Sequence, residues 1–287
     1  MTTIDFVKGH GTQNDFVLVP DPEGRLDLTP RDVTYLADRR AGIGGDGVIR
    51  VAPLSAAPDD VREQCPDAKR FMDYRNSDGS VAEMCGNGTR VFARYFVEQG
   101  LETSDTFAIA TRAGRKEITV VADGFATDLG PWRLARETEA NERGMDSVVQ
   151  VHGAPDPLPA LSLDLGNPHT VVALPPQIDL SALDLHTAPK VDPTPEHGTN
   201  VEFVRAIEHA HISMRVHERG VGETRSCGTG AAAAALATWW WGGRPEDQLD
   251  WIVDVPGGRL GVHIAADKVA LSGPAELVAR GTVSLPG

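Results

Sequence analysis

The sequence predicts an α+β protein built from two similar halves. Short alternating apolar runs typical of strands occur throughout the 287 residues, interrupted by a few stretches with helical spacing. The second half repeats the arrangement of the first. In each half a Cys-Gly-x-Gly sequence stands directly before a predicted helix, at Cys85 and at Cys227.

The first half begins with a predicted hairpin followed by a capped helix. Apolar runs at residues 4–7 and 16–19 flank a polar turn. Residues 28–40 have helical spacing behind Thr29 as N-cap, with Pro30 at the first helical position. A glycine-rich stretch, residues 42–47, follows. It lacks the G-x-x-x-x-G-K-[ST] arrangement of a phosphate-binding loop, so nucleotide binding is not expected.

The remaining elements follow the same mixture of strands and helices. Two segments rich in Pro, Ala and Asp, residues 53–60 and 153–160, favour surface connections. The expected elements are a helix at 89–99, strands at 107–111, 117–122, 161–165, 170–174, 201–206 and 211–217, and an alanine-rich helix from Cys227 to a stop at Gly242 and Gly243.

The two helices after the cysteines differ in character. The first has an apolar stripe at positions 91, 92, 95 and 96, opposed by Arg90 and Arg94, so these arginines are expected on its polar side. The second is apolar on all sides and is expected to be buried. Trp239, Trp240 and Trp241 end it. We expect them to pack against a neighbouring element or the partner of a homodimer rather than to bind a ligand.

Composition excludes several classes of partner. The formal charge of -14 and the pI near 5.0 argue against nucleic acid, because such binding needs clustered Lys and Arg. The N-terminal residues lack the basic start and apolar run of a secretory signal, and no apolar stretch reaches the roughly 18 residues that cross a bilayer. The expectation is therefore a cytoplasmic enzyme with no membrane partner, acting on a small molecule.

The three cysteines must be judged one by one. Their number is odd and none lies in a C-x-x-C pair, so neither a disulfide framework nor a zinc site is expected. A lone cysteine usually behaves as a small hydrophobic residue. For Cys65, in a polar loop beside Pro66, a surface or filler role is the expectation. For Cys85 and Cys227 the same context occurring twice favours a chemical role.

A thiol before a helix can carry a proton at neutral pH. The helix N-terminus favours the thiolate and pulls the pKa down from about 8.5. The glycines of each Cys-Gly-x-Gly sequence would let the backbone turn tightly and leave N–H groups bare for a carboxylate. A carboxylate held by two helix ends would have its α-carbon flanked by two thiols. Removal of a proton by one and delivery by the other inverts the centre.

Further repeats accompany the cysteines. Asn76 and Glu218 each stand nine residues before a cysteine, where a polar group can face the same site. A weaker repeat pairs HGTQNDF at residues 10–16 with HGTNVEF at residues 197–203. Its distance to the cysteine differs between the halves, so it supports a shared site more than a strict duplication.

Several motifs, taken in order, resemble one enzyme family. NSDGS followed by MCGNGTR, then GNPH, GTNVEF and ERGVGETRSCGTGA are similar to the diaminopimelate epimerases, over nearly the whole chain. The resemblance implies interconversion of LL- and meso-2,6-diaminopimelate for lysine and peptidoglycan synthesis, without metal or pyridoxal phosphate. It also implies two pseudo-symmetric domains, residues 1–127 with 274–287 and residues 128–273. Each would be a mixed rolled sheet or barrel around a central helix, with the active site in the cleft between them.

The resemblance also assigns roles to residues. Cys85 and Cys227 would be the acid/base pair, and His169 and Glu218 would tune their pKa values. Many family members carry a long polar residue where this chain has Gly47, so that contact does not transfer. The residues implied to bind substrate are Asn14, Asn76, Gly86, Asn87, Asn167, Asn200, Glu218, Arg219, Gly228 and Thr229, with Arg219 suited to a carboxylate through its planar fork.

Other interpretations stay open from the sequence. Asn167 before a proline is typical of a turn, His169 near strands of a structural hydrogen bonder, and Arg219 of a solvated charge. A related two-thiol racemase acting on proline or hydroxyproline is one alternative function, although it would not need residues for a distal amino-acid group. A second alternative is a binding or redox-sensing protein in which the two cysteines form a switchable disulfide.

Overall fold

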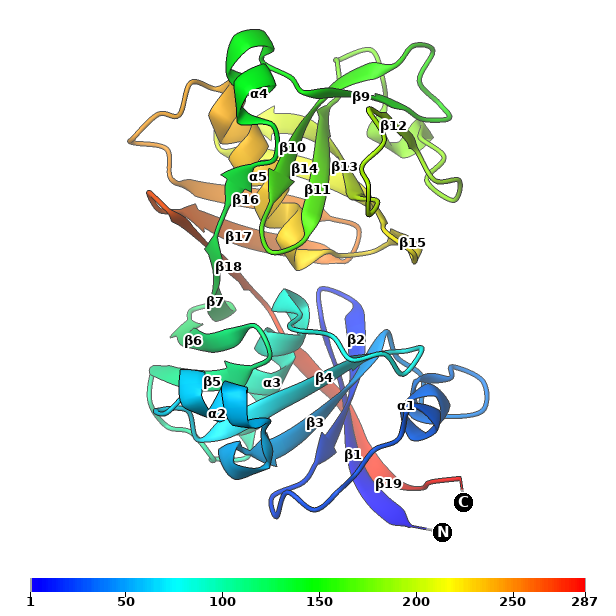
Figure 1. Cartoon of the computed structure of the whole chain (residues 1–287), viewed down its shortest axis with the longest axis vertical. Coiled ribbons are helices and arrows are strands. Elements are labelled where there is room, and N and C mark those ends of the chain that lie inside the picture. Colours follow the sequence, from blue (N-terminus) through cyan, green and yellow to red (C-terminus); the bar gives the residue numbers. More distant parts are fainter. Residues whose placement is uncertain (1, 287) are drawn as a thin grey trace. The chain divides into compact units, whose positions relative to one another are not determined.

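The computed structural model describes residues 2–286 and divides into two compact units (Figure 1). The first unit runs to Asp128 and resumes at Ser272, and the second comprises Leu129–Leu271. The chain therefore passes from one unit to the other twice. No helix among residues 2–286 is long and apolar enough to span a bilayer.

The first unit is a mixed sheet with a helix against it. Its strands follow the hydrogen-bonded order β19, β1, β2, β3, β4, β5, β6 and β7. Its elements are β1 (Thr3–Gly11), β2 (Asn14–Pro20), α1 (Pro30–Ala37), β3 (Gly47–Pro53), α2 (Asp59–Gln64), β4 (Arg70–Asn76), α3 (Gly86–Glu98), β5 (Thr106–Thr111), β6 (Gly114–Val121), β7 (Gly124–Pro131) and β19 (Glu276–Ser284).

The second unit has the same kind of sheet. Its central strands follow the order β9, β10, β11, β13, β14, β16 and β17. Its elements are β8 (Arg133–Leu134), α4 (Glu137–Arg143), β9 (Ser147–Gln150), β10 (Leu158–Asp164), β11 (Pro168–Ala173), β12 (Lys190–Asp192), β13 (Asn200–Glu208), β14 (His211–Glu218), β15 (Gly222–Thr224), α5 (Gly228–Trp241), β16 (Asp250–Val255), β17 (Gly258–Ile264) and β18 (Lys268–Gly273).

The two units repeat one topology. In the first, β1 to β6 pair antiparallel, parallel, antiparallel, parallel and antiparallel, with α3 between the fourth and fifth strands. In the second, β10, β11, β13, β14, β16 and β17 pair in the same sequence, with α5 between the fourth and fifth. The predicted α+β class with two similar halves is confirmed.

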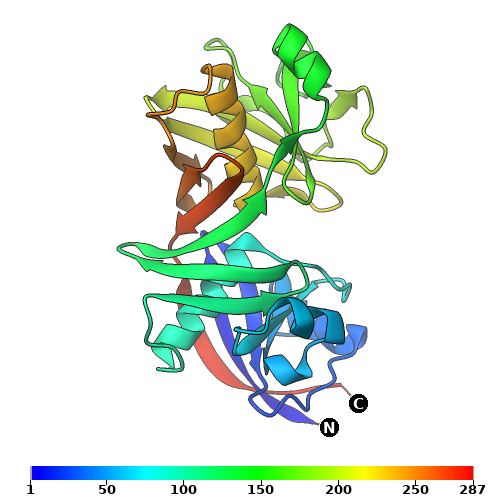
Figure 2. The ribbon, with the colours of Figure 1, turned by 60° about the vertical axis from the view of Figure 1, so that its left-hand side comes forward.

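Each unit folds its sheet around its long helix (Figure 2). Helix α3 contacts β1, β2, β3, β4 and β19, and α5 contacts β10, β11, β13, β14, β16 and β17. The first ten residues of α5 apart from Thr229 are buried, as expected for a helix that is apolar on all sides. The N-termini of these helices, which carry the two cysteines, are thereby fixed within the cores of their own units.

Several local predictions are confirmed and others are wrong. The hairpin of β1 and β2 is confirmed, as is Thr29, which caps α1 in a reciprocal capping box with Asp32. The segment 53–60 contains a 3-10 turn, and the end of the segment 153–160 is the first part of β10 rather than a surface connection. Helix α3 starts at Gly86 rather than residue 89. Its Arg90 is fully buried, so the prediction that it lies on the polar side is wrong.

Candidate active site

Cys85 and Cys227 occupy the same position in their units. Each is the N-cap of the long helix, with extended backbone angles of φ -138° and ψ 119° at Cys85, and φ -118° and ψ 116° at Cys227. The Sγ of Cys85 accepts the Gly88 N–H at 3.5 Å, and the Sγ of Cys227 accepts the Gly230 N–H at 3.4 Å. The sulfur takes the place that a serine or aspartate oxygen has in ordinary helix caps, which holds it against the positive end of the helix.

The second glycine of each motif serves close packing. Gly88 and Gly230 lie in the first helical turn, so the predicted role in a tight turn before the helix is wrong for them. A Cβ on Gly230 would stand 2.8 Å from the Glu202 Oε1 and 3.2 Å from the Cys227 Sγ. A Cβ on Gly88 would stand 2.9 Å from the Cε of Met72. Only a residue without a side chain leaves room for the carboxylate beside Cys227.

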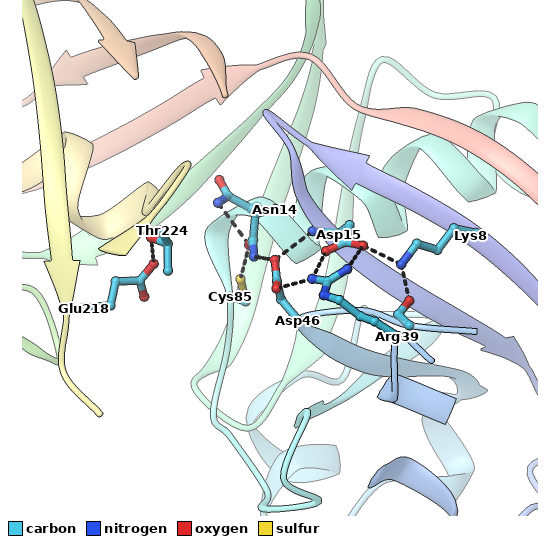
Figure 3. Close-up of polar contacts among 10 residues, drawn as sticks. Lys8, Asn14, Asp15, Arg39, Asp46, Cys85, Glu218 and Thr224 are labelled. Carbon is cyan, nitrogen blue, oxygen red and sulfur yellow. Dashed lines mark hydrogen bonds and ion pairs between the residues drawn. The ribbon is translucent and has the colours of Figure 1, made fainter. Parts of the chain in front are cut away.

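Asn14 connects Cys85 to a carboxylate in the first unit (Figure 3). Its Nδ2 donates to the Asp46 Oδ2 at 2.7 Å, and its Oδ1 accepts from the Asn87 Nδ2 at 3.1 Å. The Cys85 Sγ lies 3.7 Å from the same Oδ1. Because an ionised carboxylate only accepts hydrogen bonds, Asp46 requires that the Asn14 amide nitrogen face it and the amide oxygen face the thiol.

Asp46 belongs to a cluster of four charged groups (Figure 3). Arg39 donates to both oxygens of Asp15, at 2.9 and 2.7 Å, and to the Asp46 Oδ1 at 2.6 Å. Lys8 donates to Asp15 at 2.5 Å. Although burial opposes it, hydrogen bonds from Arg39 and Lys8 lower the pKa of Asp15, whereas burial and the charge of Asp15 raise the pKa of Asp46. The two positive charges and the two negative charges of this cluster thus neutralise one another.

Asn167 has the corresponding place in the second unit. It immediately precedes β11, the strand equivalent to β2, which begins at Asn14. Its Nδ2 donates to the Thr229 Oγ1 at 3.2 Å, and this hydroxyl lies 3.7 Å from the Cys227 Sγ. Thr229 and Asn87 each follow their cysteine by two residues. An asparagine therefore contacts the helix residue beside the thiol in both units.

Behind Asn167 lies a buried histidine and carboxylate instead of a surface charge cluster. The His169 Nε2 lies 3.1 Å from the Asn167 Oδ1, and its Nδ1 lies 2.7 Å from the Glu202 Oε1. Both side chains are fully buried. Burial raises the pKa of Glu202 against the opposing effect of His169. The sequence analysis missed Glu202, although a charged residue within the apolar run of β13 was a signal that could have revealed it.

Cys227 differs from the expectation of a lowered pKa. Burial raises its pKa well above the ordinary value, and the charges of Glu218 and Glu202 raise it further. The N–H of Gly230 and the hydroxyl of Thr229 oppose this shift. The prediction that the helix N-terminus alone brings this thiol toward neutrality is wrong for this structure, because burial and acidic neighbours prevail.

The other predicted residues lie at strand ends in both units. Asn76 ends β4 and Glu218 ends β14, the equivalent strand. Asn76 donates to the Ser80 Oγ at 3.0 Å, and Glu218 accepts from the Thr224 hydroxyl (Figure 3). The nine-residue spacing to the cysteine thus reflects one repeated connection from strand to helix.

Asn200 and Arg219 contact each other. The Asn200 Oδ1 accepts the Arg219 backbone N–H at 2.9 Å, and the Arg219 guanidinium donates to the His197 carbonyl at 2.9 Å. Asn200 begins β13, which is equivalent to β3, whereas the similar HGTQNDF sequence forms the turn between β1 and β2. The weaker sequence repeat therefore does not reflect equivalent positions, in agreement with its irregular spacing.

Two remaining positions have structural explanations. Cys65 is fully buried in a small apolar cluster with Val61 and Phe71, which confirms the filler role and excludes a surface one. A Cβ on Gly47 would stand 2.6 Å from the Cε2 of Tyr74 and 2.8 Å from the Arg75 carbonyl oxygen. The ring of Tyr74 thus fills the space in which a side chain at position 47 would start.

The tryptophans at the end of α5 pack within their own unit. Trp239 makes an edge contact with Trp132, at 6.1 Å between ring centroids, and donates to the Pro245 carbonyl. The Trp241 indole donates to the Gly144 carbonyl at 2.8 Å. Packing against a neighbouring element is confirmed, while a dimer partner at this position stays a prediction.

Comparison with known proteins decides the family. The sequence profile of diaminopimelate epimerase matches residues 6–135 and 161–278. The chain belongs to the diaminopimelate epimerase family. It is 45% identical over 293 residues to the diaminopimelate epimerase of Rhodococcus opacus (strain B4), covering 98% of this chain and 97% of the relative. It is 46% identical over 288 residues to that of Streptomyces coelicolor, covering 98% and 95%.

Solved structures share the fold of this family member at low sequence identity. A hydroxyproline epimerase from Agrobacterium vitis has a TM-score of 0.66 at 13% identity, covering 98% of this chain and 92% of that one. A phenazine biosynthesis protein of the PhzF family from Bacillus anthracis has a TM-score of 0.65 at 15% identity, covering 99% and 100%. These likenesses support the two-domain epimerase fold.

Proposed function

We propose that this chain interconverts LL-2,6-diaminopimelate and meso-2,6-diaminopimelate by a two-base reaction without metal or pyridoxal phosphate. One thiolate removes the α-proton as the substrate C–H bond breaks and an S–H bond forms. The other thiol gives its proton to the opposite face of the resulting carbanion and becomes the thiolate. Such a reaction supplies a precursor of lysine and of peptidoglycan.

The observation that carries the proposal is the duplicated cysteine cap. Two units of one topology each place a cysteine at the start of their central helix, with an asparagine in contact with the residue beside it. The first N–H groups of a helix have no intrahelical acceptor and favour an anion. We assign the backbone at Gly86 and Asn87, and at Gly228 and Thr229, to the carboxylate of the reacting centre, where negative charge develops.

The distal amino-acid group of the substrate needs its own contacts. We assign these to polar residues that lie at or directly beside strand ends. One guanidinium nitrogen of Arg219 donates to the His197 carbonyl, and the guanidinium has further N–H groups that can bind a carboxylate. Glu218 carries a negative charge suited to an ammonium group. The complete proposed set is Asn76, Asn167, Asn200, Glu218 and Arg219, with Asn14 beside the reacting centre.

The activity is tested with LL-diaminopimelate and a coupled dehydrogenase specific for the meso isomer. The assay contains excess reductant, a chelator and no pyridoxal phosphate, and proline and hydroxyproline serve as alternative substrates. We expect turnover of diaminopimelate only. Racemisation of proline without turnover of diaminopimelate would replace the proposed substrate.

The two-base mechanism has a test of its own in deuterated water. When a solvent-equilibrated thiol delivers the new proton, product carries deuterium from the first turnover, while recovered substrate stays largely protiated at low conversion. A single base can return the proton it took, so part of its product would stay unlabelled. Mass spectrometry of the separated isomers, from each direction at initial rate, distinguishes the two. Substantial unlabelled product would exclude Cys85 and Cys227 as opposed acid and base.

A cytoplasmic location and a homodimer complete the proposal. Cell fractionation with an antibody tests the first, and sedimentation equilibrium of the purified chain tests the second. A membrane-bound or strictly monomeric chain would contradict these two points without affecting the assigned reaction.

A further inference from the structure

Arg90 is a buried cation that pairs with no carboxylate among the described residues. It lies in α3, five residues after Cys85, and its side chain is fully buried. Its Nη2 donates to the Thr12 Oγ1 at 3.2 Å and its Nε to the Pro274 carbonyl at 3.4 Å. Its Nη1 is buried with no hydrogen-bond partner among residues 2–286. A buried charge is normally paired, because burial in a protein interior destabilises an unpaired ion.

The guanidinium is folded back toward the start of its own helix. Long side chains in helices point toward the N-terminal turn. A Cβ on Gly11 would stand 3.0 Å from the Arg90 Nη2 and 3.1 Å from the Asn87 carbonyl oxygen. The guanidinium therefore lies next to the first turn of α3, the turn that Cys85 caps. A glycine at position 11 leaves the space for it.

Other charges around this end of α3 do not neutralise Arg90. Four charged side chains on β1, on β2 and between α1 and β3 pair with one another. They are Lys8, Asp15, Arg39 and Asp46. From β19, Glu276 lies 3.9 Å from His10. The charge that acts on Arg90 is that of Cys85, which raises the arginine pKa, while burial lowers it to about 10. Because the attraction between the two groups is mutual, the Arg90 charge in turn favours the thiolate form of Cys85 over its thiol form.

The second unit offers the opposite environment. The residue five positions after Cys227 is Ala232, which is fully buried and uncharged. The ionisable groups acting on Cys227 are Glu218 and Glu202, both acidic. One thiol thus has a buried cation beside it and the other has carboxylates.

We propose that Arg90 is the counter-ion of the Cys85 thiolate, so that in the resting enzyme Cys85 carries the negative charge and Cys227 carries the proton. This inference deepens the proposed two-thiol function and rests on it. The resting enzyme is then ready to remove a proton on the face that Cys85 reaches. After turnover Cys85 holds that proton and Cys227 is the thiolate. Arg90 favours the return, in which Cys85 loses its proton to solvent and Cys227 gains one.

The test measures the pH dependence of iodoacetamide alkylation at each cysteine of the full chain, by mass spectrometry of the peptides. The midpoint of each profile reports the thiol pKa and does not depend on access to the reagent. In the unsubstituted protein we expect the Cys85 midpoint to lie below that of Cys227. A lower midpoint for Cys227 would overturn the proposal without any variant, including the case in which Arg90 variants fail to fold.

Substitution then tests the role of Arg90. Arg90→Met removes the charge and keeps most of the stem, and we expect the Cys85 midpoint to rise by at least about one pH unit, roughly tenfold slower alkylation near neutrality. Arg94→Met is the matched control, because Arg94 lies one turn further along α3, is part-exposed and pairs with Glu98 at 2.9 Å. It should leave the midpoint unchanged.

The alternative is that Arg90 only braces the turn between β1 and β2, where Thr12 and Gln13 have φ of 50° and 63°. A brace predicts lower stability of Arg90→Met with an unchanged Cys85 midpoint, and this result in a folded variant would overturn the proposal. An equal shift in Arg94→Met would do the same. Failure of the unsubstituted protein to epimerise diaminopimelate would instead remove the proposed function, a result separate from the alkylation profiles.

Discussion

The two thiol sites have the same backbone arrangement and differ in the charged side chains around them. Cys85 and Cys227 cap equivalent helices, and Asn14 and Asn167 stand at equivalent strand starts. Around Cys85 the ionisable groups are a balanced cluster at the surface and the buried Arg90. Around Cys227 they are acidic, namely the fully buried Glu202 and the half-buried Glu218. The duplication thus preserves the position of the two cysteines, while the charged side chains around them differ between the halves.

In the proposed mechanism, this difference would decide which of the two cysteines carries the single proton. Two identical and independent thiols would have the same pKa, so at that pH only about half of the molecules would hold a single proton, and that proton would lie on either sulfur equally often. In the proposal, Arg90 favours the thiolate at Cys85, whereas burial and the acidic neighbours Glu218 and Glu202 raise the pKa of Cys227. We therefore expect the side chains that differ between the halves to set the direction of the first proton transfer.

The largest expected effect comes from removing either thiol. Cys85→Ala and Cys227→Ala should each lower the rate of epimerisation by at least roughly a hundredfold, since a lost acid or base removes one face of the reaction. Cys65→Ala should leave activity nearly unchanged, because that thiol is buried in a separate apolar cluster. Rates from the coupled assay, with circular dichroism to verify folding, test this. If a variant of Cys85 or Cys227 kept more than a few per cent of the activity, the substituted cysteine would be excluded from the mechanism.

The sequence predicted the features that depend on local pattern. The cysteine caps, the Thr29 cap and the first hairpin follow from residues close together in the chain. The duplication was visible because Cys-Gly-x-Gly recurs before a helix in both halves. Such signals rest on helix capping and turn chemistry, which operate over a few residues.

The features that were missed depend on partners far away in the sequence. Arg90 was assigned to a polar helix face because periodicity treats every arginine as polar, yet Thr12 and Pro274 accept its hydrogen bonds in the interior. Glu202 is buried because β11 runs parallel beside β13 and brings His169 to it. Neither contact follows from spacing within one element, so Arg90 and Glu202, unlike Glu218, could be recognised as charges of these sites only in the structure.

A smaller effect is expected from the glycines after the cysteines. Gly230→Ala would place a methyl group 2.8 Å from the buried Glu202 carboxylate and 3.2 Å from the Cys227 Sγ, so one of them must move. We expect a loss of about 1–3 kcal/mol in the free energy of unfolding and a rate lowered roughly thirtyfold. In Gly88→Ala the closest atom is the flexible Cε of Met72, at 2.9 Å. That variant should lose less than about tenfold in rate. Equal losses in the two variants would mean that the carboxylate beside Cys227 has no special effect.

The smallest and most specific change is Glu202→Gln. The glutamine keeps the shape and can still form a hydrogen bond with the His169 Nδ1, but it removes one of the two acidic charges that raise the pKa of Cys227. Burial, the first cause of the shift, remains, so the Cys227 alkylation midpoint should fall by only about half a pH unit to one unit, with Cys65 as internal reference.

The same shift has a consequence for stability, and its sign follows from the direction of the pKa change. A thiol whose pKa is raised by folding contributes stability below its unfolded pKa of about 8.5, and this contribution is lost as the pH rises through the folded value. In urea unfolding, the decline in stability should therefore begin at the same pH in both proteins and end at a lower pH for Glu202→Gln than for the unsubstituted chain. The prediction requires Glu202 to be ionised while Cys227 titrates. An unchanged midpoint together with an unchanged decline would show that Glu202 keeps its proton, and the distinction between the two sites would then rest on Glu218 and Arg90.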